Sequence, residues 1–420
     1  MSPSQPGIGL VGAAYALVYG TQGQQGANYT PAVELVTETF PDIPPNLVAF
    51  SATINSLTVI AMAFLTPTIL RKYSNKKEWL LYASLISLTV IGTLPILTSS
   101  FYPLLILRVL LGVPLGVMFP VIVELLAERY RDESVRDRVL VWSVVSLNAQ
   151  ALLLELFGGF LGRYGYRLVF VLPLYTIPVI VFCKAVGLTP KTSEETQPCL
   201  PDSDDIQHER ERESDSEGER EDAPLLSDGT LPFPTIRALV DATFFTVAQG
   251  TQFIYIVLIS LHLAQDMGVE DSFVAGLCSA TTMLGSMVGS LCMETVIRLT
   301  GRMAAPLFFA SECVGVFMAC STSVSPVTVG GILIGFGCGG LLPLILGRAS
   351  EYHVSHRATV QSILMVGQNI GMMGFPELMA VFGTPTRTFV VGGVIALICM
   401  LAWLPLLPKN KGTSQGTIYV

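Results

Sequence analysis

The sequence predicts an all-α membrane protein of about twelve transmembrane helices, arranged as two related six-helix halves. Three observations support this prediction: the apolar composition, a series of segments long enough to cross a bilayer, and an internal repeat. The chain of 420 residues is 51% hydrophobic and only 13% charged, with a mean hydropathy of +0.59. A soluble globular domain is about 25% charged. The composition is therefore typical of a membrane protein.

A helix needs about 20 mainly apolar residues to cross the hydrocarbon core. Segments of this kind recur along both parts of the chain. The first six are expected at 7–25, 46–70, 79–98, 102–127, 139–161 and 167–188. The second six are expected at 239–264, 272–296, 303–322, 327–350, 358–381 and 386–407.

These segments divide the chain into four regions. Residues 1–188 form the N-terminal half and residues 237–408 the C-terminal half, with a linker at 189–236 and a short tail at 409–420. Of the 24 Lys and Arg residues, 20 lie in loops on the side of the linker and both termini, and only three lie in the opposite loops. Basic loops stay cytoplasmic, so a multi-pass protein with both termini and the linker in the cytoplasm is expected.

The linker is rich in acidic residues and poor in apolar ones, a composition typical of disordered segments. A simple tether between the halves is one role that fits it. A second role comes from Glu221, Leu225 and Leu226, which resemble the acidic dileucine signal that sorting adaptors recognise in eukaryotic proteins. That signal directs proteins to endolysosomal membranes, and without it the plasma membrane is the expected location.

The two halves repeat short patterns in the same order. Gly20-Thr21-Gln22 in the first predicted helix recurs as Gly250-Thr251-Gln252 in the seventh. In the fourth and tenth helices a Gly, Gly, Pro pattern recurs at one constant offset, and Asn148 in the fifth helix falls near Asn369 in the eleventh. A duplicated six-helix unit explains these matches, and many secondary transporters use such repeats to build a central site.

Arg108, Gly112 and Gly116 resemble the fourth-helix pattern of the major facilitator superfamily, an Arg followed by two glycines at four-residue spacing. Gly158-Gly159 and the segment that begins at Gly165 resemble its fifth and sixth helices. The resemblance covers nearly the whole chain except the linker. It implies the twelve-helix fold of that family and a function in transport of a small solute by alternating access.

Two departures from the family pattern bear on mechanism. The loop between the second and third helices has Arg71 where the family has an acidic residue, which weakens the case for the ion-pair latch attributed to that loop. In the fifth helix the family's antiporters carry a Gly-Pro pair, and here the corresponding residues are Leu154 and Glu155. This difference argues against drug/proton antiport. It favours a role in which the Glu155 carboxyl group binds a proton or a cation.

Charged groups inside a bilayer cost at least about 2.5–3.5 kcal/mol each on insertion scales, so they are functional candidates by default. At about 1.5 Å rise per residue, Arg108 and Glu155 lie at similar depth, and we expect them to pair. Two roles fit such a pair: a structural lock between helices, or a pair that opens when substrate or a proton arrives. Glu312, in the ninth helix, has no assigned role.

Four amide side chains lie at corresponding places in the two halves, and either of two roles fits them. Hydrogen bonds between helices are one, and contact with the transported solute is the other. In the resembled family the first, fourth, seventh and tenth helices line the cavity, which favours the second role for the two glutamines. The substrate and proton pathway is therefore predicted to include Arg108, Glu155, Gln22, Gln252, Asn148 and Asn369.

The paired glycines of the fourth and tenth helices have a different expected role. Small residues let helices pack closely and slide. We assign helix packing and hinge motion to Gly112, Gly116, Gly335 and Gly339.

The sequence predicts a secondary transporter of a small organic solute, with proton coupling left open; the alternative is a transport-fold receptor or scaffold that binds a solute without moving it. An enzyme is not expected, because no nucleophile arrangement or His/Asp/Glu cluster is present. The eight cysteines lack metal-binding spacing, so neither a metal nor a cofactor is predicted. The expected partners are the solute, a possible co-transported H⁺, the lipid bilayer and sorting adaptors, but no nucleic acid.

Overall fold

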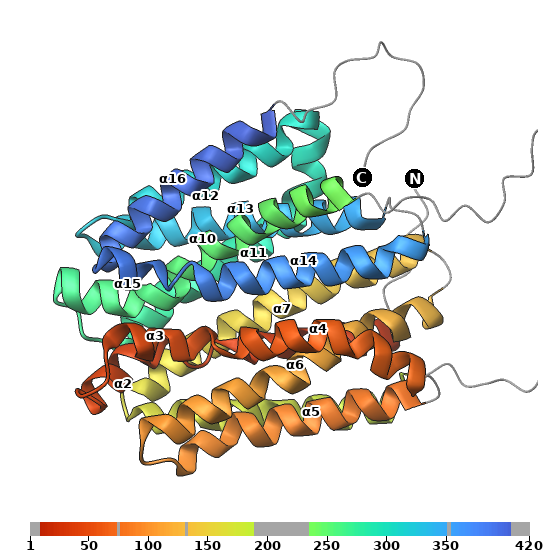
Figure 1. The fold of residues 1–420 in the computed structure, drawn as a ribbon, viewed down its shortest axis with the longest axis horizontal. Coiled ribbons are helices and arrows are strands. Elements are labelled where there is room, and N and C mark those ends of the chain that lie inside the picture. Colours follow the sequence, from red (N-terminus) through yellow and green to blue (C-terminus); the bar gives the residue numbers. More distant parts are fainter. Residues whose placement is uncertain (1–8, 74–75, 131–132, 189–234, 351–353, 405–420) are drawn as a thin grey trace, which may run out of the picture.

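The computed structural model describes residues 9–73, 76–130, 133–188, 235–350 and 354–404, and every regular element in these ranges is a helix. The helices run roughly side by side in two groups, the N-terminal half in red to yellow and the C-terminal half in green to blue (Figure 1). We call the end of the bundle that holds Val186 and Thr235 the linker end. The end that holds Gly165 and Asp271 is the opposite end.

The N-terminal half contains the six predicted spans, several of them built from two consecutive helices. They are α1 (Gly9–Gly20) with η1 (Thr21–Gln25), α3 (Pro45–Thr53) with α4 (Asn55–Lys72), α5 (Lys77–Thr93) with η4 (Leu94–Leu97), α6 (Phe101–Arg129), α7 (Glu133–Gly162), and η5 (Tyr166–Tyr175) with α8 (Thr176–Val186).

The C-terminal half repeats this arrangement, and its first two spans are single long helices where those of the N-terminal half are broken. They are α10 (Thr235–Met267), α11 (Ser272–Thr300), α12 (Ala304–Ala319), α13 (Val324–Ser350), α14 (Val354–Gly374) with α15 (Leu378–Phe382), and α16 (Pro385–Trp403). A short 3-10 helix, η6 (Gly301–Met303), joins α11 to α12. Gly301 has φ 56°, a left-handed conformation that favours glycine at the end of a helix.

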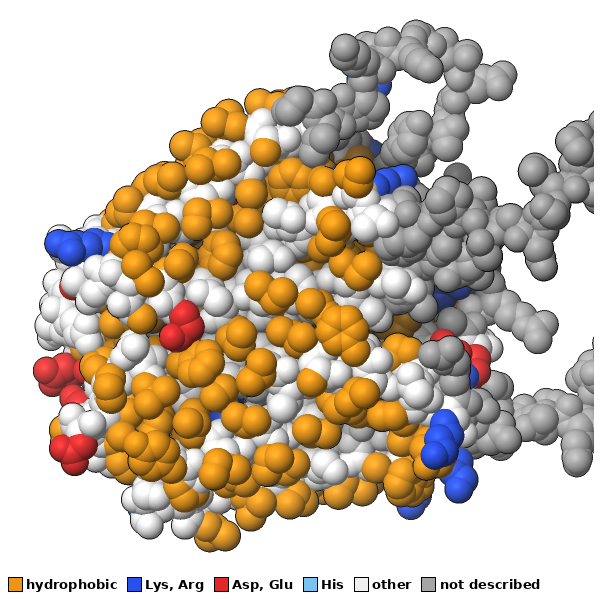
Figure 2. All heavy atoms as spheres, viewed as in Figure 1, with side chains coloured by type: hydrophobic (Ala, Val, Ile, Leu, Met, Phe, Trp, Pro, Cys, Tyr) orange, Lys and Arg blue, Asp and Glu red, His pale blue; other side chains and the backbone are white. Residues whose placement is uncertain are grey.

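Nine segments of the described ranges are long and apolar enough to span a bilayer, and one of them, Ser272–Ala319, holds both α11 and α12. The two remaining predicted spans are the short α1 with η1, and α14, which carries more polar residues. Figure 2 shows a mainly hydrophobic face between the ends of the bundle, with most charged side chains near those ends. The twelve-helix, two-half architecture matches the fold class that the sequence predicts.

The first span differs in detail from the expected single helix. After Gly20 the α-helix tightens into η1, whose sequence is Thr-Gln-Gly-Gln-Gln. Glycine is a poor helix former, and a 3-10 stretch within a spanning segment is a common hinge geometry. A further 3-10 turn, η2 (Thr30–Ala32), and a short helix, α2 (Val33–Thr39), follow at the opposite end. These last two elements are not among those that the sequence predicts.

The paired glycines lie at equivalent helix contacts in the two halves. A Cβ on Gly112 would lie 2.1 Å from the carbonyl oxygen of Asn55, and one on Gly335 would lie 1.9 Å from that of Thr282. Gly116 faces α4 in the same way, and Gly339 faces α11 with a Cβ position 2.0 Å from the Ser286 carbonyl oxygen. The backbones of α6 with α4, and of α13 with α11, therefore approach one another closely.

Candidate functional site

A cavity of about 90 Å³ lies between the two halves. The N-terminal half contributes η1 and α7 to its wall, and the C-terminal half contributes α10, α11, α13 and α14. The polar side chains that line it are Gln22, Asn148, Glu155, Gln249, Gln252, Ser286 and Gln368. No Lys, Arg or His belongs to this described lining, and Glu155 is its one carboxyl group.

Glu155 lies where the cavity ends and the two halves meet. Its side chain is fully buried. The Thr30 hydroxyl donates to its carboxyl oxygens at 3.3 and 3.4 Å, and the Ser279 hydroxyl of the other half donates to Oε2. Ser279 Oγ also lies 3.1 Å from the Ala275 carbonyl oxygen. That carbonyl can accept the Ser279 proton, so a protonated Glu155 can donate to Ser279 and an ionised one can accept from it.

Arg108 does not line this cavity, and the prediction that it pairs with Glu155 is wrong. The guanidinium donates from Nε to the Ser51 carbonyl oxygen at 3.1 Å and from Nη2 to the Ala52 carbonyl oxygen at 2.6 Å. It also lies over the Tyr29 ring, with Cζ 5.0 Å from the ring centre. Among the described residues, no ion pair joins Arg108 to Glu155.

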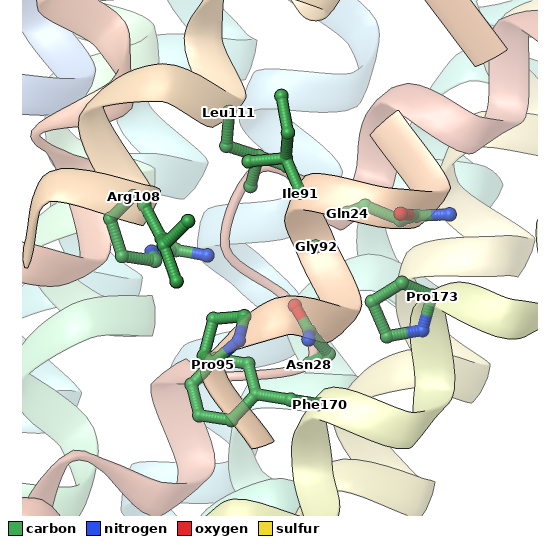
Figure 3. A pocket seen from close by; sticks show the side chains of 10 residues that line it. Gln24, Asn28, Ile91, Gly92, Pro95, Arg108, Leu111, Phe170 and Pro173 are labelled. Atoms are coloured by element: carbon green, nitrogen blue, oxygen red, sulfur yellow. The ribbon is translucent and has the colours of Figure 1, made fainter. Parts of the chain in front are cut away.

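The partners of Arg108 explain its position. Helix α3 ends at Thr53, before α4 begins, which leaves carbonyl oxygens at a helix C-terminus inside the protein. A cation is favoured at that end of a helix. Together with Gln24, Asn28 and Phe170, Arg108 also lines a separate small cavity of about 10 Å³ (Figure 3). This volume is close to the minimum that holds one water molecule. Its role in this structure is to join α6 to the break in the second span.

One face of α7 closes the cavity toward the opposite end of the bundle. Glu155 and Gly159 are four residues apart and lie on one side of α7, and Arg163 comes directly after the last residue of this helix. We call these three residues the α7 stripe. A Cβ on Gly159 would lie 2.6 Å from the Ser272 carbonyl oxygen, and the Ser272 hydroxyl donates to the Gly159 carbonyl oxygen at 3.0 Å. The backbones of α7 and α11 are therefore in direct contact just beyond Glu155.

The α7 stripe ends in an ion pair between the halves at the surface. Arg163 Nε donates to Asp271 Oδ1 at 2.9 Å and Nη2 donates to Oδ2 at 2.5 Å. Asp271 also accepts from the Phe273 backbone N–H at the start of α11. The bond from Arg163 is the main reason why the pKa of Asp271 lies below its ordinary value. The pair therefore stays ionised at neutral and moderately acidic pH.

Glu34, on α2, makes the stability of this end depend on pH. Burial, with smaller contributions from Glu38 and from Glu270 of the other half, raises its pKa from 4.5 to about 7. A raised carboxyl pKa favours the protonated form. The contribution of Glu34 to the free energy of unfolding is therefore greatest below pH 4.5 and is lost as pH rises through about 7.

We expect the thermal stability of the purified protein to fall as pH rises from about 4.5 to about 7, and Glu34→Gln to flatten this dependence. The amide keeps the shape of the side chain and cannot ionise. Thermal unfolding across this pH range measures the effect, with Asp42→Asn as the control because Asp42 is an exposed carboxylate nearby. An unchanged slope in Glu34→Gln contradicts the assignment.

The amide residues fall into two groups. Gln22, Gln252 and Asn148 line the cavity as part of one polar surface, whereas Asn369 does not. Asn148 Nδ2 donates to the Val144 carbonyl oxygen at 3.0 Å, and Asn369 Nδ2 makes the equivalent bond to Met365 at 2.9 Å. The repeat thus preserves this local bond, while only one of the two asparagines lines the cavity.

Several residues of the site were not predicted from the sequence. Gln249 and Gln368 line the cavity, and Gln368 Nε2 donates to Gln249 Oε1 at 3.3 Å. Gln249 lies one turn before Gln252 on the same face of α10, a spacing that the sequence does contain. Thr30 and Ser279 gave no such signal, because their role depends on contacts with Glu155 from elsewhere in the chain.

Glu312 lies one layer behind the cavity wall, on α12. It is fully buried, and its Oε2 accepts from the Thr251 hydroxyl at 2.9 Å. A Cβ on Gly337 of α13 would lie 2.5 Å from Glu312 Cγ, so a glycine provides the space for this side chain. Glu312 therefore connects α12 to the part of α10 that carries Gln252.

Two six-helix halves around a polar cavity define a helical membrane transporter. A family model described as Major Facilitator Superfamily matches residues 8–199 and 242–418, and the chain belongs to this superfamily of secondary transporters. The structure is similar to that of a mutant of the nucleoside transporter NupG, with 10% identity, a TM-score of 0.60, and coverage of 95% of this chain and 100% of that chain. At this identity the likeness shows the fold alone. No curated protein sequence matches the chain.

Proposed function

We propose that this protein moves a small organic solute across a membrane by alternating access, coupled to protons through Glu155. The observation that carries the proposal is the position of this one carboxyl group, at the closed end of the cavity and in contact with both halves. The solute reaches the cavity when the halves separate at one end and leaves when they separate at the other.

The α7 stripe supports this assignment of Glu155. Opening of the opposite end must separate Glu155 from Ser279 and Arg163 from Asp271, since each pair joins the two halves. An ionised carboxylate that loses its hydroxyl partner in a bilayer is costly. A proton or a solute group that binds Glu155 lowers this cost, and in this way binding is coupled to opening.

Solute counterflow in proteoliposomes tests the proposal. Vesicles that contain the purified protein and unlabelled solute are diluted into labelled solute, with and without a pH gradient. The panel consists of small organic anions and small uncharged solutes, and the uncharged solutes include nucleosides, the class named for NupG. Binding of a panel solute without counterflow would favour a receptor or scaffold over a transporter.

We further propose that both termini and the linker are cytoplasmic and that the linker binds sorting adaptors. The supporting observation is the sequence pattern at Glu221, Leu225 and Leu226, which lies outside the described residues together with the tail at 409–420. Lys72, Lys77 and Arg129 end or begin helices at the linker end of the bundle, and basic loops stay cytoplasmic.

In a eukaryotic cell, the double substitution Leu225→Ala and Leu226→Ala is expected to move the protein from endolysosomal membranes to the cell surface, because it removes the adaptor-binding pair. Surface labelling with a membrane-impermeant reagent measures the change. Substitution of Leu231, also in the linker, is the control. An unchanged surface fraction in the double variant rules out the sorting role.

A further inference from the structure

Two glutamines at repeat-related positions extend into the cavity from opposite halves. Gln22 lies on η1 and Gln252 on α10, and each follows the same Gly-Thr pair. Gln252 is only 5% exposed. Within the described part of the chain, Gln22 Nε2 is buried without a hydrogen-bond partner, and no bond to the Gln252 amide is present.

Two polar side chains next to these amides, those of Thr21 and Gln249, make hydrogen bonds within the protein. The Thr21 hydroxyl donates to the Val18 carbonyl oxygen at 2.7 Å. Gln249 accepts from Gln368 and donates from Nε2 to Cys338 Sγ at 3.0 Å. A buried amide nitrogen without a partner costs free energy, so the unpartnered Nε2 of Gln22 is best explained by a ligand that binds between Gln22 and Gln252.

The rest of the lining limits the chemistry of that ligand. Phe253, Met283 and Met372 supply apolar and aromatic surface. The described lining has one carboxyl group and no cationic side chain, so an organic anion or phosphate ester would be placed near Glu155 without a compensating positive charge. A primary amide offers a donor and an acceptor side by side, and a glutamine binds a flat edge with the complementary pair through two hydrogen bonds.

We propose that Gln22 and Gln252 form an amide pair that binds an uncharged, planar solute with adjacent hydrogen-bond donor and acceptor groups, such as a cyclic amide. This inference rests on the proposed function only in placing the solute in the same cavity. The apolar residues contact the faces of the solute, and the amides select its edge. Glu155 remains at the closed end of the cavity, next to the bound solute.

The test is ligand-dependent thermal stabilisation of the full-length protein purified in detergent. The probes are uracil and uridine, which carry a cyclic amide edge; glucose, which is uncharged but lacks that edge; and benzoate and glucose 6-phosphate, which are anions. The expected result is a concentration-dependent rise in Tm with uracil or uridine only. A rise with glucose or an anion and none with the cyclic amides overturns the proposal, as does no rise with any cyclic amide up to its solubility limit.

Substitution of each glutamine by methionine keeps the length of the side chain and removes its hydrogen bonds. We expect Gln22→Met and Gln252→Met each to weaken binding of the stabilising compound by at least about tenfold. Gln361→Met, on α14 and outside the cavity lining, is the matched control and should bind within about twofold of the parent. Unchanged affinity in both cavity variants overturns the amide pair.

This experiment separates the amide pair from the transport proposal. If a solute binds through both glutamines but shows no counterflow, the proposal of the amide pair stands and the proposal of transport is contradicted. If an anion shows counterflow that neither substitution changes, the proposal of the amide pair is contradicted and the proposal of transport stands.

Discussion

Glu155→Gln is expected to retain solute exchange and to lose the response of uptake to an imposed pH gradient. Glutamine has nearly the shape of a protonated glutamate, so the contacts with Thr30 and Ser279 can re-form. It cannot bind or release a proton. Exchange at zero gradient should therefore continue, because it needs only the movement of the halves.

The size of the expected loss follows from the free energy of the gradient. One proton per solute supports about tenfold accumulation for each pH unit, since a factor of ten corresponds to about 1.4 kcal/mol. The variant should equilibrate its solute without accumulation. Glu377→Gln, a half-buried carboxyl outside the cavity lining, is the control and should accumulate solute as the parent does. Parental accumulation by Glu155→Gln would remove this residue from the coupling mechanism.

Gly335→Ala is expected to cause the largest loss of stability among single-methyl substitutions at the paired glycines. The added Cβ would lie 1.9 Å from the Thr282 carbonyl oxygen and 2.8 Å from the Ser286 backbone nitrogen. Both are backbone atoms of α11, so the two helices must move apart. Overpacking of this kind costs about 1–3 kcal/mol and occasionally more.

Thermal unfolding and the monodisperse fraction after purification measure this effect. Gly374→Ala is the matched control, because a Cβ at Gly374 meets nothing within 4 Å. We expect Gly335→Ala to unfold at a clearly lower temperature than the parent and Gly374→Ala to match it. Equal unfolding temperatures for the two variants would show that α11 and α13 do not pack as described.

The number of spans and their order could be predicted from the sequence, because hydropathy and the internal repeat depend on residues that are close in the chain. The repeat also gave Gln22 and Gln252, which the structure places on one cavity. The short helix α2 was missed, since a seven-residue element at the membrane surface leaves no hydropathy signal. The change from α1 to η1 was also missed, although its glycines are visible in the sequence.

The pairing of Arg108 with Glu155 shows a limit of counting along helices. Rise per residue gives the depth of a side chain but not the direction in which it points around the helix axis. Arg108 turns toward the carbonyl oxygens at the end of α3, and Glu155 turns toward α11 of the other half. Arg108→Ala is therefore expected to leave the carbonyl oxygens at the end of α3 without their cation, and it is not expected to strand a carboxylate.

The contacts that close the opposite end could not be predicted for a related reason. Gly159 and Ser272 are more than a hundred residues apart, and neither carries a chemical signal of its own. Arg163 and Asp271 are charged residues in loops at the opposite end of the bundle, and loops are the ordinary location for charges. Their pairing depends on how the two halves dock, and a single sequence holds no direct record of that arrangement.

A reversible crosslink across the opposite end tests whether this end must open during transport. In Arg163→Cys with Asp271→Cys, a short reducible bis-thiosulfonate reagent joins α7 to α11 where the ion pair lies in the parent. We expect crosslinking to stop counterflow and reduction to restore it, while Arg163→Cys alone, treated in the same way, keeps its activity. Counterflow at the parental rate with the crosslink intact would contradict alternating access through this end.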